Sequence, residues 1–288
     1  MIFKSKILRN ENISQNYFKL ALRLPEDSVQ PIPGQFYNIR CSETTDPLLR
    51  RPFSLHRLIQ DQNLLHIEIL YRVIGKGTDW LSKRKKEEIL DVVGPLGNGF
   101  LMEEDPENIL LIARGIGIAP LYGLGEESLK KNKKKKIFLL IGARLKERIF
   151  YEEECKKIGE VFLYTDDGSK GFHGRAPDLL LHLLKHKKLP KDLLLYACGP
   201  NLMLKELSEI SNRFGLPGRV ALETHMACGF GVCLSCVCPL KGGSIKRNQQ
   251  WGKPSLLWSE DRSRAYSLIC QDGPIYDIQE VDWDEWIT

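Results

Sequence analysis

Four cysteines near the C-terminal end constrain this chain more than any other feature. Cys228, Cys233 and Cys236 form a C-x4-C-x2-C run, and Cys270 follows at a distance. This is the spacing of plant-type [2Fe–2S] ligation. The run also contains glycine, alanine and serine, small residues that let a tight loop bring backbone N–H groups close to cluster sulfurs. The segment therefore predicts a carrier of single electrons.

Three other uses of these thiols fit the sequence less well. Disulfides are typical of secreted proteins, and the first residues do not resemble a secretion signal. A structural zinc site normally has two C-x2-C pairs, and only one is present here. Unligated thiols are the third alternative. The fourth ligand is also open, because Cys238 lies just beyond Cys236 and the gap to Cys270 is long.

Length and charge narrow the class of protein. The 288 residues allow two or three domains, each with its own core. No apolar run reaches the roughly 18–20 residues that span a bilayer. The net charge of +5 is mild, and much of the excess lies in a lysine run at 130–136 that is typical of a solvated loop. We expect no nucleic-acid or membrane partner, and the free cysteines indicate a reducing cytoplasm.

The chain divides into three segments, which predict a multi-domain fold. Residues 1–100 contain short, partly alternating apolar runs separated by Pro and Gly turns, a pattern that predicts an antiparallel β-barrel. In residues 101–217, apolar strands near 109–113, 137–141, 161–165 and 193–197 alternate with helical stretches. This rhythm predicts a parallel sheet with helices on both faces, as in α/β nucleotide-binding domains. Residues 218–288 form the cysteine segment.

The first turn of the α/β segment carries Gly115 and Gly117 between a strand and a helix. Glycines at such a turn let a ligand phosphate approach the positive end of the helix. Close packing between strand and helix is an equally good reason for them. The turn alone therefore does not decide whether a nucleotide binds.

Two motifs in the first segment favour a flavin. The sequence R-P-F-S ends an irregular stretch, and Arg51 can bind a diphosphate as a two-bond fork while Ser54 hydrogen-bonds a flavin ring. The sequence L-Y-R-V-I-G-K-G-T follows, and its Gly77 and Thr78 are suited to opening a phosphate-binding helix. Each motif alone is also compatible with a surface arginine or an ordinary strand.

These motifs, followed by G-P-L-G-N-G-F and M-A-C-G-F-G-V-C-L-S-C, occur in the order found in ferredoxin-reductase-like flavoproteins. The whole chain resembles the electron-transfer subunits of NAD-dependent (class 1B) dihydroorotate dehydrogenases. Further matches are G-A-R at 142–144, Y-T-D-D-G-S at 164–169 and Y-A-C-G-P at 196–200.

The resemblance implies the site residues one by one. It assigns FAD binding to Arg51, Pro52, Phe53, Ser54, Leu70, Tyr71, Arg72, Gly77 and Thr78. It assigns the cluster to Cys228, Cys233, Cys236 and Cys270, the last within a C-x-D-G-P sequence. Cys198 is a candidate catalytic residue beside the nicotinamide, although a small buried residue at a strand end explains it equally well.

The resemblance also implies cofactors, partner and activity. We expect FAD, a [2Fe–2S] cluster and NAD, with an FMN-containing catalytic subunit as the partner in a two-plus-two heterotetramer. Electrons would run from dihydroorotate, oxidised in that subunit during pyrimidine biosynthesis, through the cluster and FAD to NAD+. The alternative is the small subunit of another flavin-based complex, an NADH-dependent ferredoxin:NADP or sulfide oxidoreductase. A zinc-stabilised binding module without cofactors is a third reading.

The chain departs from the family pattern at two places. Arg114 stands where a glycine is usual, and it could clash with a dinucleotide, pair with a phosphate or face a partner. An insertion at about 245–266 lengthens the interval before Cys270. The acidic end at 282–286 and Cys238 are further additions.

Overall fold

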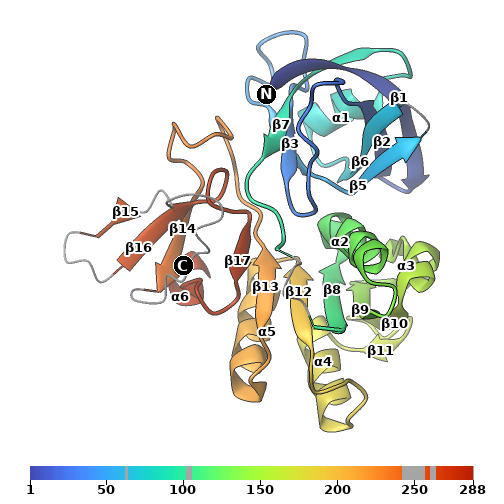
Figure 1. Cartoon of the computed structure of the whole chain (residues 1–288), viewed down its shortest axis with the longest axis vertical. Coiled ribbons are helices and arrows are strands. Elements are labelled where there is room, and N and C mark those ends of the chain that lie inside the picture. Colours follow the sequence, from blue (N-terminus) through green and yellow to red (C-terminus); the bar gives the residue numbers. More distant parts are fainter. Residues whose placement is uncertain (62–63, 102–105, 242–256, 260–263, 288) are drawn as a thin grey trace.

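The computed structural model describes residues 1–61, 64–101, 106–241, 257–259 and 264–287. It has three parts: a curled antiparallel sheet, a parallel sheet flanked by helices, and a small C-terminal β unit (Figure 1). The predicted fold class is confirmed. Within the described residues, no helix is long and apolar enough to cross a membrane.

The first part is a seven-stranded antiparallel sheet in the order β4-β3-β7-β1-β2-β6-β5. Its core follows the two-residue period of a strand: Leu20 and Leu22 on β2, and Ile67 and Ile69 on β6, all point to one buried face. Its elements are β1 (Ile2–Ser14), β2 (Tyr17–Arg23), β3 (Phe36–Ile39), β4 (Arg51–Ser54), β5 (Arg57–Asp61), β6 (Leu64–Arg72), α1 (Lys76–Ser82) and β7 (Ile89–Leu96).

The second part is a sheet in the order β11-β10-β9-β8-β12-β13-β17, parallel except for the edge strand β17. Leu110 and Ile112 pack with α4 and α5, while Ile109 and Leu111 pack with α2 and α3, so the strands are covered on both faces. The elements are β8 (Asn108–Arg114), η1 (Gly115–Gly117), α2 (Ile118–Lys131), β9 (Lys136–Ala143), η2 (Lys146–Arg148), α3 (Glu152–Ile158), β10 (Glu160–Thr165), β11 (Phe172–His173), α4 (Ala176–Lys185), β12 (Leu194–Cys198), α5 (Asn201–Phe214) and β13 (Gly218–Ala221).

The third part carries the cysteine loop. It contains a three-stranded sheet in the order β14-β16-β15. Its elements are β14 (Val237–Lys241), β15 (Leu257–Trp258), β16 (Arg264–Leu268), β17 (Ile275–Asp277) and α6 (Trp283–Ile287). Two strands of the predicted third segment, β13 and β17, complete the sheet of the second part, so the cysteine loop is joined to the parallel sheet on both sides. Most of the predicted insertion at 245–266 lies outside the described residues.

The acidic end is part of this fold. The Trp283 indole is buried and donates to the carbonyl oxygen of Ile278 at 2.9 Å. Lys205 on α5 donates to Asp284 at 2.5 Å, and the Tyr266 hydroxyl donates to Glu285 at 2.7 Å. These contacts fasten α6 to α5 and to β16.

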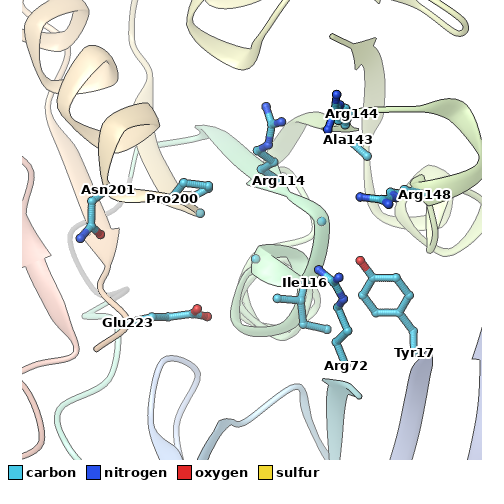
Figure 2. A pocket seen from close by; sticks show the side chains of 13 residues that line it. Tyr17, Arg72, Arg114, Ile116, Ala143, Arg144, Arg148, Pro200, Asn201 and Glu223 are labelled. Atoms are coloured by element: carbon cyan, nitrogen blue, oxygen red, sulfur yellow. The ribbon is translucent and has the colours of Figure 1, made fainter. Parts of the chain in front are cut away.

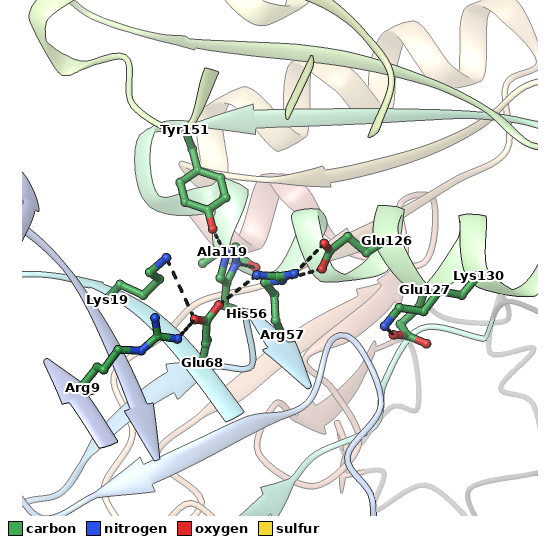
Figure 3. Close-up of polar contacts among 10 residues, drawn as sticks. All are labelled: Arg9, Lys19, His56, Arg57, Glu68, Ala119, Glu126, Glu127, Lys130 and Tyr151. Atoms are coloured by element: carbon green, nitrogen blue, oxygen red, sulfur yellow. Dashed lines mark hydrogen bonds and ion pairs between the residues drawn. The ribbon is translucent and has the colours of Figure 1, made fainter. Parts of the chain in front are cut away.

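A polar network joins the curled sheet to α2 (Figure 3). Arg57 on β5 makes two hydrogen bonds to Glu126 on α2, at 2.6 and 2.9 Å, and a third to the buried Glu68 at 3.3 Å. Gly123 allows this approach, because a side chain there would clash with the carbonyl oxygen of His56. The two sheets are therefore held at a fixed separation.

Candidate functional site

A cleft of about 530 Å³ opens between the curled sheet and the parallel sheet (Figure 2). The curled sheet contributes Tyr17 and Arg72, and the rest of the lining comes from the carboxyl edge of the parallel sheet. In open α/β sheets, ligands bind at this edge. The residues that line the cleft are Tyr17, Arg72, Arg114, Gly115, Ile116, Gly117, Ala143, Arg144, Arg148, Gly199, Pro200, Asn201 and Glu223.

The two glycines of the first turn have different roles. Gly115 adopts φ +55°, the left-handed region that favours glycine, and only the Tyr17 hydroxyl lies within 4 Å of the place a side chain would take. Gly117 packs against β12, where a side chain would clash with the carbonyl oxygen of Cys198. Gly115 therefore leaves room in the cleft, as the ligand-binding interpretation of this turn predicts. Gly117 serves strand–helix packing, as the structural interpretation predicts.

The cleft is rich in positive charge. Four arginines line it, namely Arg72, Arg114, Arg144 and Arg148, against a single lining carboxylate, Glu223. Arg114 is paired through its guanidinium nitrogens with Asp166, at 3.0 and 2.6 Å. The other three form no ion pair with a carboxylate among the described residues. Such a lining suits an anionic ligand, and guanidinium groups bind phosphates well.

Glu223 is a cleft residue that the sequence analysis missed. It follows β13 at the carboxyl edge of the sheet, is open to solvent on the cleft side, and has its pKa raised by desolvation from the surrounding protein. The sequence feature that could have identified Glu223 as a cleft residue is its position just after a strand of the α/β sheet.

Cys198, the predicted catalytic residue, has its thiol in the core. It is fully buried among the residues between the sheet and α2, and burial raises its pKa well above the usual value. The following residues of the same turn, Gly199 and Pro200, line the cleft in its place.

The predicted flavin residues converge from three elements of the curled sheet. Arg51–Ser54 form β4, Leu70–Arg72 end β6, and Gly77 and Thr78 lie in the first turn of α1. The Arg51 side chain packs over Gly77, with Nε 3.2 Å from the place a Cβ would occupy. The rings of Phe53 and Tyr71 meet edge to face at 5.7 Å.

This set of residues fits FAD. Arg51 forms no ion pair with a carboxylate in the described part of the chain, and its Nη1 donates to the carbonyl oxygens of Leu49 and Arg50 at 2.6 and 3.2 Å. A diphosphate would therefore meet no competing carboxylate at this guanidinium. The Thr78 hydroxyl accepts hydrogen bonds from the backbone amides of Ile74 and Gly75 at 2.9 and 3.2 Å, which fixes the loop before α1. Arg72, at the end of β6, lines the cleft.

The structure brings Cys270 to the cysteine loop. The amide of Gly231 donates to its sulfur at 3.1 Å, and the amide of Cys270 donates to the sulfur of Cys236 at 3.5 Å. Cys236 and Cys270 thus form one pair. Cys228 and Cys233 form a second, in which the amide of Cys233 donates to the sulfur of Cys228, also at 3.5 Å. Two thiol pairs joined by one loop are the arrangement that two irons require, since each iron takes two thiolates.

The loop is built for close backbone approach. Gly229 and Gly231 adopt φ +83° and +86°. Hydrogen bonding, above all from Ser235, lowers the pKa of the Cys233 thiol to about 6, and the Cys270 thiol lowers that of Cys236 to about 6. The hydrogen bond to Cys236, together with burial, raises the pKa of Cys270, so this pair shares one proton between its two sulfurs. The thiolate form that binds metal is therefore favoured at Cys233 and Cys236.

The donor chemistry of this loop fits an iron–sulfur cluster. All four side chains are thiols. Backbone amides donate to the sulfurs of Cys228, Cys236 and Cys270, and the Ser235 hydroxyl lies 3.2 Å from the sulfur of Cys233. Cys238 lies apart from the set, fully buried, with its sulfur directed to the carbonyl oxygen of Pro239 at 3.7 Å.

Asn38 links the strand of the flavin residues to the cysteine loop, and no motif in the sequence points to it. It lies on β3 opposite Pro52 of β4, and its side-chain amide donates to the carbonyl oxygen of Cys228 at 3.4 Å. Its buried Oδ1 has no hydrogen-bond partner among the described residues.

Two family models match the chain. The oxidoreductase NAD-binding domain matches residues 111–209, which hold most of the parallel sheet. The iron-sulfur cluster binding domain of dihydroorotate dehydrogenase B matches residues 223–249, which hold the cysteine loop.

Curated relatives match over nearly the full length. The chain is 34% identical to the dihydroorotate dehydrogenase B (NAD(+)) electron transfer subunit of Desulforamulus reducens, over 98% of this chain and 99% of that protein. It is 37% identical to the subunit of the same name from Bacillus caldolyticus, over 93% and 94%. The Fusobacterium nucleatum subunit of that name is 34% identical, over 95% of each chain.

Solved structures agree with the fold. An NADH-dependent reduced ferredoxin-NADP oxidoreductase is 29% identical, with a TM-score of 0.79 over 98% of this chain and 91% of that one. A ferredoxin NADP+ reductase from Neisseria gonorrhoeae has a TM-score of 0.62 at 18% identity, over 74% and 92%, a likeness of fold alone.

Proposed function

Because the chain belongs to the family of dihydroorotate dehydrogenase B (NAD(+)) electron transfer subunits, we propose that it passes electrons between NAD and a catalytic partner subunit. FAD and a [2Fe–2S] cluster are its own cofactors. The observation that carries this proposal is the order of three sites in space. The arginine-lined cleft adjoins the flavin residues, and Asn38 joins the flavin strand to the four-thiol loop.

When bound, FAD exchanges two electrons with a nicotinamide and single electrons with an iron–sulfur cluster. The chain's own residues supply binding and orientation. Arg51, Gly77 and Thr78 would hold the FAD diphosphate, and Ser54 would orient the ring. Tyr71 is buried in the core of the curled sheet with its hydroxyl donating to Asn10 at 3.0 Å, so it would support this site from beneath. Cys228, Cys233, Cys236 and Cys270 would hold the cluster, leaving Cys238 as a core residue.

The cleft would hold the nicotinamide nucleotide. Its arginines suit the phosphates, and the turn Gly199–Asn201 with Glu223 forms the opposite wall (Figure 2). We retain Cys198 as a residue that positions this turn beside the nicotinamide, acting from the core through the backbone that follows it.

The partner in this proposal contains FMN and oxidises dihydroorotate, in a complex of two copies of each chain located in the cytoplasm. Division of labour follows from the cofactors: the partner performs the substrate chemistry, and this chain carries the electrons away to NAD+. The chain alone is therefore not expected to oxidise dihydroorotate.

The decisive experiment is anaerobic reduction of the purified complex, followed by visible absorbance. Dihydroorotate should bleach the flavin and cluster bands of the complex but leave those of the isolated chain unchanged. NADH should bleach both preparations, since the nucleotide cleft belongs to this chain. A complex that dihydroorotate does not bleach would refute the role in pyrimidine biosynthesis.

The similarity to the NADH-dependent reduced ferredoxin-NADP oxidoreductase supports one alternative, a small subunit of another flavin-based complex. In that case the partner would exchange electrons with ferredoxin and NADP, or with sulfide. Bleaching of the complex by reduced ferredoxin or NADPH, without any response to dihydroorotate, would favour this alternative.

A further inference from the structure

Arg114 and Asp166 form an ion pair across the carboxyl edge of the parallel sheet. Arg114 ends β8 and Asp166 follows β10, so the pair spans the intervening strand β9. The backbone of Arg114 is paired in register with Gly142 on β9. Two nearly parallel hydrogen bonds, at 3.0 and 2.6 Å, join the two side chains.

The pair lies where a ligand of this sheet is expected. Arg114 lines the cleft together with the glycine turn that follows it. Both side chains are about one-quarter exposed, so the pair is accessible from the cleft yet partly shielded from water. Phosphates of nucleotides bind at this edge of α/β sheets, next to the first turn.

Asp166 presents Arg114 with the geometry of a phosphate. A carboxylate and a phosphate both accept two parallel hydrogen bonds from a guanidinium group. The neighbouring Asp167 has a different task, because its carboxylate accepts from the amide and hydroxyl of Ser169 at 3.1 and 2.7 Å and so fixes the turn. The Asp166 side chain makes no such bond to the turn, and its contact to Arg114 is the one recorded among the described residues.

The rest of the cleft favours release of this pair when an anion enters. Arg72, Arg144 and Arg148 line the same space without carboxylate partners among the described residues. A diphosphate drawn in by these charges meets Arg114 already oriented for two hydrogen bonds. Asp166 then becomes a negative charge beside a negative ligand.

We propose that dinucleotide binding is an exchange of ion-pair partners, in which the ligand's diphosphate takes Arg114 from Asp166. Asp166 thus acts as an internal competitor that keeps Arg114 oriented and lowers the affinity of the cleft for diphosphate-containing nucleotides. In this proposal Arg114 neither obstructs the dinucleotide nor contacts the partner subunit. It is a phosphate-binding residue that is paired with Asp166 until the ligand enters. This inference rests on the proposed nucleotide cleft.

The test is titration of the oxidised, cofactor-loaded chain with ADP-ribose, followed by calorimetry. Asp166→Asn removes the competing charge and should tighten binding about fivefold, equivalent to about 1 kcal/mol for a partly exposed pair. Asp167→Asn is the matched control and should leave the affinity unchanged. Arg114→Gly should weaken binding, and adding Asp166→Asn to it should tighten binding less than Asp166→Asn does in the wild-type chain, because only charge repulsion and no ion pair is then removed.

Three outcomes decide between this exchange and its rivals. Weaker binding by Asp166→Asn would overturn it, because Asp166 would then contact the ligand directly. Tighter binding by Arg114→Gly would overturn it in favour of a steric block. Unchanged affinity in both variants, with melting temperatures lowered, would reduce the pair to a structural tie. Wild-type protein that binds no ADP-ribose would instead contradict the nucleotide cleft itself.

Discussion

Asn38 donates its side-chain amide to the carbonyl oxygen of Cys228 at 3.4 Å, which ties the curled sheet to the cysteine loop. Asn38 is 1% exposed, and the loop backbone at Gly229 packs directly on its amide nitrogen. The adjacent strand β4 carries Arg51–Ser54, the predicted flavin residues. Asn38 therefore pairs through its backbone with the strand of the proposed flavin site and contacts the cysteine loop through its buried side chain.

Replacement of Asn38 should loosen the loop. Asn38→Ala removes one hydrogen bond, worth about 1 kcal/mol, and leaves a gap under Gly229. We expect the folded chain to persist, with less iron per chain and a broadened electron paramagnetic resonance signal of the reduced cluster. Asn12→Ala is the matched control, since Asn12 lies on the same sheet but is exposed, and its side-chain amide donates to the carbonyl oxygen of its neighbour Gln15. Equal iron content and identical spectra in both variants would show that Asn38 does not support the loop.

The fourth cluster ligand can be identified by two serine variants. Cys270 accepts a hydrogen bond from Gly231 of the loop, whereas Cys238 lies in the core with its sulfur near Pro239. Cys270→Ser should therefore abolish or strongly alter the cluster absorbance. Cys238→Ser should keep full iron content and lower the unfolding free energy by about 1–2 kcal/mol, because it buries a hydroxyl. Loss of iron in the Cys238 variant alone would reverse the assignment.

The sequence was sufficient for the elements and motifs because both are local patterns. Strands and helices of the parallel sheet follow apolar periodicity, and β8 and β10 lie within a residue of the predicted runs. Cysteine spacing is likewise local for Cys228, Cys233 and Cys236. Their chemistry could thus be predicted before any contact was known.

The remaining features depend on contacts between distant residues. Asn38 and Cys228 are separated by 190 positions, and Arg114 and Asp166 by 52. An asparagine inside a strand has no sequence signature, and the partner of an arginine is fixed only when the strand order places β8, β9 and β10 side by side. The same holds for β13, which follows the predicted domain boundary yet pairs with β12 in the parallel sheet.

The cysteine loop exposes apolar side chains that should contact the partner subunit. Phe230, Val232 and Leu234 are 55%, 72% and 48% exposed, and electrons must enter or leave the cluster close to them. Val232→Asp places a charge in the proposed interface and should weaken association with the catalytic subunit at least tenfold, or about 1.4 kcal/mol. Sedimentation of the mixed subunits measures this.

Val29→Asp provides the matched control for that surface. Val29 is 71% exposed, almost the same as Val232, but it lies in the first part of the chain, between β2 and β3. The Val29→Asp variant should associate normally with the catalytic subunit, and both variants should retain iron. Normal assembly of Val232→Asp would exclude the loop from the interface.

His56 should make the stability of the chain depend on pH. Its ring is fully buried between the two sheets, where Nδ1 donates to the carbonyl oxygen of Ala119 at 2.8 Å and Nε2 accepts from the Tyr151 hydroxyl at 2.7 Å (Figure 3). Burial, with smaller contributions from the charges of Arg57 and Lys19, lowers the pKa of His56 to about 3 despite the hydrogen bond to Ala119, which acts to raise it. The native ring is therefore neutral at physiological pH.

The direction in which stability changes with pH is set by the unfolded chain, in which the histidine has a pKa of about 6.5. As the pH falls below that value, the unfolded state takes up a proton that the folded state does not, so stability is lost between about pH 6.5 and pH 3. The loss from this group approaches about 1.4 kcal/mol per pH unit.

The His56→Gln variant should be less stable than the wild-type chain at neutral pH, but this difference in stability should shrink as the pH falls to about 5. Melting temperatures of both proteins across this range, with the exposed His173→Gln as control, measure the effect. A deficit that stays constant with pH would mean that the native His56 takes up its proton as readily as the unfolded chain does.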